Sequence, residues 1–130
     1  MEWKGIRFYK VEAESKSDEN FTSISMNLDV NDMKLKGDEL TIDFAYSVDY
    51  KPSVASLKFK GVVVLGGARA DLEKVEKEWK KQKTIPKNVA EPLINVITFN
   101  AESNSVLVAK AISIVPPLLA PKIEIGITQR

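Results

Sequence analysis

The chain contains neither cysteine nor histidine. The lack of cysteine excludes disulfides, thiolate nucleophiles and zinc sites built on sulfur. The lack of histidine removes the side chain that most often transfers protons near neutral pH and most often ligates metals. Ser-His-Asp and Cys-His mechanisms are therefore excluded within one chain. We expect a protein that is not an enzyme and that carries no metal or other cofactor.

Long hydrophobic runs and a strong net charge are also missing. No run approaches the ~18 apolar residues of a membrane span, and residues 1–5 lack the apolar core of a signal peptide. The net charge of +1 lacks the basic excess of a typical nucleic-acid binder. We therefore expect a cytoplasmic protein that neither inserts into a membrane nor binds nucleic acid.

The length and composition are those of an ordinary globular domain. The chain has 130 residues, of which 44% are hydrophobic and 28% are charged. A domain near this size buries roughly two-thirds of the surface that its unfolded chain exposes. No internal repeat or linker divides the sequence, so we expect a single domain that spans residues 1–130.

Alternation of apolar and polar residues predicts four successive strands in the first half of the chain. Residues 40–50 give the clearest pattern, because every even position is apolar and the odd positions are polar or small. Two strands, at 6–11 and 24–30, precede it, and the second is expected to bend or bulge at 31–32. A fourth, at 57–65, is apolar on both faces in its second half and should be central or covered. The short connections favour an antiparallel sheet.

Residues 71–83 predict a surface helix. Asp71 suits the N-cap position, and acidic residues near the start and lysines near the end match the helix dipole. A narrow apolar stripe would face the rest of the protein. Its members are Leu72, Val75 and Trp79.

The sequence from 88 to 115 allows two interpretations. Asn88 and Glu91 have the spacing of a capping box, which favours a helix. The β-branched residues of 94–99 and a possible turn at 101–104 favour a hairpin instead. The residues alone leave both alternatives open.

Proline marks the C-terminal sequence. Pro116, Pro117 and Pro121 predict an extended segment. The isoleucines at 123, 125 and 127 alternate with other residues and predict a short final strand or tail.

Three features that could carry chemistry have simpler explanations. The glycine-containing turn at 66–70 matches neither a P-loop nor a dinucleotide fingerprint, and a strand that leads into a helix needs such a turn. Glu39, Asp43 and Asp49 could bind a divalent ion or supply paired carboxylates, but residues on the polar face of a strand are usually solvated. Lysines between 74 and 87 alternate with glutamates, which favours a solvated helix face over a phosphate-binding surface.

Aromatic residues crowd two adjacent predicted strands. Most are expected to serve an ordinary core between the sheet and a helix. One thin helix cannot cover a four-stranded sheet, however, so the remaining apolar surface must meet the second helical segment, another subunit or a ligand. Oligomerisation is the simpler of the last two explanations.

Four segments, taken in order, carry a family resemblance. They are Ser-Met-Asn-Leu-Asp-Val at 25–30, the alternating strand at 40–50, the segment 57–66 and the proline-punctuated segment 116–123. In this order the chain resembles the SecB family of polypeptide-holding chaperones, and more closely the small SecB-like proteins of archaea and some bacteria. The resemblance covers nearly the whole chain.

The resemblance implies an α+β fold, in which a four-stranded antiparallel Greek-key sheet has helices packed on one face. Such chains usually assemble as a dimer or a dimer of dimers. The resemblance also assigns residues 89–99 and 106–114 to helices. It implies polypeptide-binding grooves between sheet, helix and proline segment. The positions that match these grooves are Phe44, Tyr46, Tyr50, Phe59, Leu118 and Leu119.

The chain departs from the export chaperones of that family in two ways. Those proteins are strongly acidic and end in a metal-binding tail that engages the translocase motor. This sequence is near neutral and ends in Gln129 and Arg130. The departures argue against a role in secretion.

Three functions follow as hypotheses. The leading one is an oligomeric protein that holds non-native or extended polypeptides without ATP. The second is a dedicated adaptor that binds one specific protein partner, such as an antitoxin-like segment. The third, an enzyme or small-ligand protein that uses carboxylates and tyrosines, has the least support.

Overall fold

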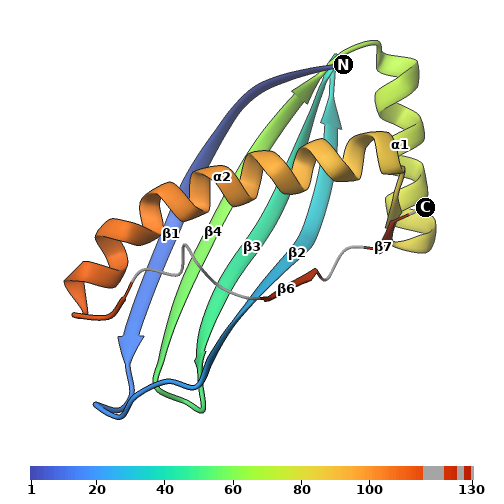
Figure 1. Cartoon of the computed structure of the whole chain (residues 1–130). Helices are drawn as coiled ribbons and strands as arrows, with labels where there is room; N and C mark the ends of the chain where they lie inside the picture. The colour runs from blue at the N-terminus through green and yellow to red at the C-terminus, as the bar shows by residue number, and fades with distance from the viewer. Residues whose placement is uncertain (116–121, 126–127, 130) are drawn as a thin grey trace.

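The computed structural model describes residues 1–115, 122–125 and 128–129 (Figure 1). The strands and helices in chain order are β1 (Glu2–Ser15), β2 (Ser23–Lys36), β3 (Glu39–Lys51), β4 (Ala55–Gly66), α1 (Arg69–Gln82), β5 (Thr84–Ile85), α2 (Lys87–Ala111), β6 (Lys122–Ile125) and β7 (Thr128–Gln129). The predicted fold class, an α+β fold with a four-stranded antiparallel sheet and helices packed against it, is confirmed.

The main sheet has the strand order β1-β4-β3-β2-β6. Strands β2, β3 and β4 form a meander, and β1 crosses over to pair with β4, which makes the antiparallel part a Greek key. Backbone N–H groups of Lys16 and Thr22 donate to carbonyls of the β3–β4 hairpin at 2.8 Å and fix this crossover to the end of the sheet. Strand β6 adds to the outer edge of β2 in parallel.

The alternation in the sequence sets which face of the sheet is buried. Every even residue of β3 from Leu40 to Tyr50 is buried, and the odd residues from Thr41 to Ser47 are half-buried on the opposite face. The predicted bulge is confirmed, because the register of β2 and β3 shifts between Val30 and Asp32. Strand β4 lies between β1 and β3, so its predicted central position is also confirmed.

Helix α1 packs against β2 and β3 and buries the predicted apolar stripe. The predicted N-cap is wrong: the helix begins at Arg69, with Ala68 as the N-cap residue and no side-chain cap. Asp71 lies in the first turn, where its negative charge is still favourable near the positive end of the helix dipole. A few-residue error of this kind is ordinary at helix ends.

Helix α2 is one continuous helix across the sheet (Figure 1). Residues 89–99 and 106–111 are helical as expected, but the expected break between two helices is wrong, and residues 112–114 lie beyond the helix. The alternative hairpin is wrong, and so is the capping box at Asn88, because the N-cap is Pro86. The polar residues near the expected break form hydrogen bonds within the helix. The side chains of Asn100, Ser103 and Asn104 each donate to the backbone carbonyl four residues earlier.

One row of α2 residues, spaced four apart, packs against the sheet. Its members are Val89, Leu93, Ile97, Ala101, Ser105 and Ala109, all buried. The side chains are large in the first half of the helix and small in the second half. The small residues let the helix lie close to the part of the sheet that carries the large aromatic rings, because close packing requires large side chains to face small ones. Helix α2 therefore supplies the cover that α1 cannot.

Candidate protein-binding surfaces

The four aromatic residues that were predicted to line a groove lie in the hydrophobic core of the chain. Phe44, Tyr46, Tyr50 and Phe59 are each at most 1% exposed. Phe59 lies 5.6 Å from Phe8 and 6.3 Å from Tyr46 between ring centroids. A client polypeptide could reach these rings only if α2 moved away from the sheet, so their role in binding stays a prediction.

The predicted groove residues Leu118 and Leu119 lie outside the described residues. The chain that leads to them is anchored, because the Tyr50 hydroxyl donates a hydrogen bond to the carbonyl of Val115. Tyr46 makes a second contact on the same side of the core, and its hydroxyl donates to the Met26 sulfur at 3.0 Å. Tyr46 thus contacts β2, and Tyr50 contacts the segment that follows α2.

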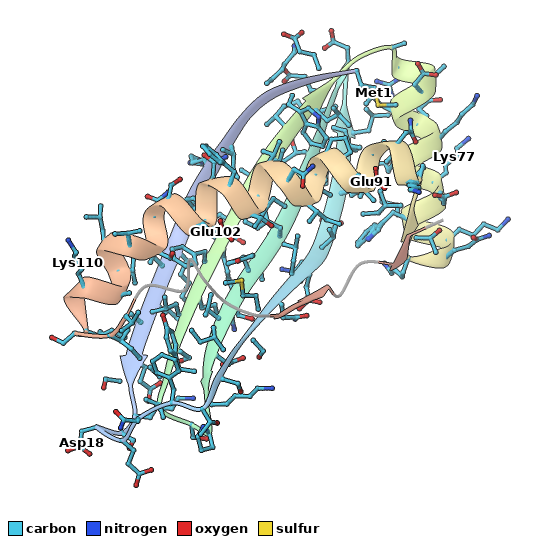
Figure 2. All side chains as sticks on the ribbon, viewed as in Figure 1. Met1, Asp18, Lys77, Glu91, Glu102 and Lys110 are labelled. Carbon is cyan, nitrogen blue, oxygen red and sulfur yellow. The ribbon has the colours of Figure 1, made fainter. Side chains whose placement is uncertain are left out.

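A hollow of about 380 Å³ opens where α2 ends. We call it the end hollow. Its apolar lining comes from Phe21, Val54, Ile112, Ile114 and Val115, and polar residues of the β1–β2 loop complete it. Asp18, in that loop, is labelled at the far end of the sheet in Figure 2. The end hollow is therefore a mixed site, apolar on one part of its lining and polar on the other, beside Val115.

The outward side of α2 carries no charge along five exposed positions spaced four apart. These positions, the α2 ridge, are Asn95, Phe99, Ser103, Leu107 and Ala111. Phe99 is 72% exposed and Leu107 is 71% exposed. A helix on a protein surface normally presents charged residues to water. The α2 ridge instead presents two large apolar side chains to water, and burying them against another chain would be favourable. Sequence reasoning missed it, because the spacing appears only when residues 87–111 are one helix.

Strand β1 has an unpaired edge. It hydrogen-bonds to β4 on one side, and no other strand of the described residues pairs with it. Tyr9 and Val11, in the middle of this strand, are 50% and 48% exposed. An edge of this length offers a row of free backbone donors and acceptors for another strand. Helix α2 also contacts β1, so this edge strand lies beneath one part of the helix.

The carboxylates considered as a site make ordinary surface interactions. The Tyr9 hydroxyl donates to Asp43 at 2.9 Å, and Glu39 pairs with Lys4 at 3.1 Å. Among the residues that the structure describes, no three acidic side chains are grouped so that they could hold a metal ion. None of the helices in this part of the chain is long and apolar enough to cross a membrane.

Burial changes the titration of the two core tyrosines. It raises the pKa of Tyr50 to about 12. It also raises the pKa of Tyr46, and the negative charge of Glu102 adds to that shift. A tyrosine in the unfolded chain has a pKa of about 10. Between pH 10 and 12 the folded state therefore binds more protons than the unfolded state.

We expect the free energy of unfolding to fall as the pH rises above 10. The contribution of Tyr50 is fully present below pH 10 and is lost through pH 12, with a slope of at most about 1.4 kcal/mol per pH unit. Urea unfolding at several pH values between 8 and 11.5 measures how the free energy of unfolding depends on pH. Tyr50→Phe should fall less steeply than the wild type over that window, and parallel curves would contradict the assignment.

Comparisons of the chain with protein-family models, with curated proteins and with solved structures found no match. The resemblance to the SecB family therefore stays a prediction.

Proposed function

We propose that this protein binds extended or non-native polypeptides without ATP, and that it does so as an oligomer. The observation that carries the proposal is the α2 ridge, a row of five uncharged exposed positions on which Phe99 and Leu107 are largely exposed. Burying these two side chains against another polypeptide would remove apolar surface from water, which favours association.

The α2 ridge and the open edge of β1 together support self-association. Helix surfaces gain from burying exposed apolar side chains, and a strand edge gains by pairing its free N–H and C=O groups. Helix α2 carries the ridge, and it contacts β1, which carries the open edge. A second copy of the chain would present the same two features, as a two-fold symmetric interface requires.

The end hollow supports polypeptide binding. Its apolar residues would bury apolar side chains of a client, at ~25 cal/mol per Å² of surface removed from water before ordering costs are subtracted. One shallow hollow of about 380 Å³ would hold a client weakly. Several hollows in one oligomer would hold it more tightly, because the second contact of a bound client becomes intramolecular.

A light-scattering assay tests the function. An enzyme that aggregates on heating is incubated with the wild-type chain, and we expect scattering to be suppressed when the oligomer and the enzyme are equimolar. Absence of suppression with two unrelated enzymes would remove the proposal. Tight binding of one particular host protein, without suppression of aggregation, would favour a dedicated adaptor instead.

Exchanging Phe99 and Leu107 together for Ser should separate the subunits. Each side chain is an exposed apolar anchor, and loss of such an anchor at the centre of an interface costs about 2 kcal/mol or more. The dissociation constant of the oligomer should therefore rise at least about 100-fold. Analytical ultracentrifugation across a dilution series measures this dissociation constant.

The matched control exchanges Lys77 and Lys81, two exposed residues of α1, for Ser (Figure 2 labels Lys77). Unchanged mass in the ridge variant, or a monomeric wild type, would contradict the role of the ridge.

A further inference from the structure

The two edges of the sheet differ. Among the described residues no strand pairs with the outer edge of β1, whereas the edge at β2 carries β6, a segment from the C-terminal end of the same chain. The pairing is parallel, and it joins Ser25 to Lys122, Met26 to Ile123, Asn27 to Glu124 and Leu28 to Ile125. We infer that this part of the β2 edge is a binding site for an extended polypeptide, and that β6 is its resident, displaceable occupant. The inference rests on the proposed function and names the site at which a client strand would bind.

The site is confined to one part of β2. Toward the other end of the strand, the backbone N–H of Leu35 donates to the Glu76 carboxylate of α1 at 2.8 Å. At that end of the edge, a side chain of α1 therefore already occupies a backbone donor that a guest strand would need. The segment 25–28 is closed only by another strand, so its backbone groups form the kind of surface to which a guest strand can add.

The resident strand is weakly held. Its ladder spans four residues, and parallel ladders are slightly less stable per residue than antiparallel ones. The next described strand, β7, pairs with β5 over only two residues. Short strands of this kind open with low free energies, whereas the central strands of a sheet open only with the whole domain. Strand β6 can thus leave β2 while β1 to β4 stay folded.

The chemistry of the resident strand indicates the guest that fits. The sequence of β6 is Lys-Ile-Glu-Ile, in which β-branched aliphatic residues alternate with charged ones. Neighbouring residues of a strand point to opposite faces of its sheet. On β2, the residues Ile24, Met26 and Leu28 all lie on the buried face. A guest with aliphatic residues at every second position would match the apolar face of that strand.

A tether makes β6 a competitor for the guest. The Tyr50 hydroxyl holds the carbonyl of Val115, so the segment that leads to β6 starts at a fixed point close to the sheet. A tethered strand rebinds at a high effective concentration. The apparent affinity for a guest is therefore the intrinsic affinity multiplied by the fraction of molecules in which the edge is free. Locking β6 in place should remove guest binding altogether.

The lack of native cysteine permits a clean locking experiment. Asn27→Cys together with Glu124→Cys places two thiols at paired positions. Neighbouring strands lie about 4.8 Å apart, which is within the range that a disulfide spans. Ser25→Cys with Lys122→Cys is a second locking pair, in case the first does not fold. The matched control, Ser47→Cys with Lys58→Cys, joins β3 and β4, which stay paired in any state of β6.

The probe is a fluorescein-labelled peptide with the sequence of residues 121–130, and the measurement is its fluorescence anisotropy. We expect the reduced locking variant to bind it as the wild type does, the oxidised variant to bind at least tenfold more weakly, and added reductant to restore binding. The control pair should bind equally in both redox states. Equal binding by the oxidised and reduced locking variants would overturn the inference, as would absence of binding by the reduced form.

The aggregation assay separates this inference from the proposed function. If the oxidised variant still suppresses aggregation as the reduced one does, the β2 edge is not the client site, although the holding function survives. If the wild type suppresses no aggregation, while peptide binding still responds to the lock, the edge binds strands and the holding function is lost. Absence of both activities removes both proposals.

Discussion

Replacing Phe59 by Ala is expected to lower the free energy of unfolding by about 4 kcal/mol. The ring of Phe59 is 0% exposed and packs between Phe8 and Tyr46. Its removal deletes a large buried apolar side chain and leaves a cavity, because the rigid sheet beneath it can collapse only in part. Urea unfolding at neutral pH measures the change.

Phe99→Ala is the matched control, since the chemical change is the same at a position that is 72% exposed. At low protein concentration it should alter the stability of the protomer by no more than about 0.5 kcal/mol. A loss below about 1 kcal/mol for Phe59→Ala would contradict the core role of this ring. It would mean that α2 is not packed firmly on the aromatic part of the sheet, and that the predicted groove is open in solution.

The sheet could be predicted from the sequence, because its signals are local. The alternation from Leu40 to Tyr50 specifies both a strand and its buried face, since a shift of one residue would expose every apolar side chain. The bulge at residues 31–32 was equally visible. The parallel pairing of β6 with β2 could not be predicted, because nothing in a four-residue segment indicates which distant strand edge it will join.

The candidate site was harder to predict, because burial of an aromatic side chain depends on what covers it. Tyr46 and Tyr50 alternate on a strand as groove residues would, and their burial depends on segments distant in the sequence, such as Phe21 against the ring of Tyr50. The course of α2 depends on residues 100–105, whose weak helix propensity suggested a break. Ala101 and Ser105 continue the buried row of α2, and the asparagine side chains bond within the helix, so tertiary packing overrides propensity there.

Exchanging Gly61 for Ala is expected to lower the free energy of unfolding by about 3 kcal/mol. A Cβ atom at this position would collide with the carbonyl oxygen of Arg7 and would lie 2.9 Å from the ring of Phe44. The first contact is with the backbone of β1, so it can be relieved only if β1 moves away from β4.

Gly5→Ala is the matched control, since a Cβ atom there would have no neighbour within 4 Å, and it should change stability by no more than about 0.5 kcal/mol. Urea unfolding compares the two, and similar stabilities would show that β1 is held loosely. Because β1 carries the open edge proposed for self-association, Gly61→Ala should also weaken the oligomer, which a dilution series in the ultracentrifuge would detect.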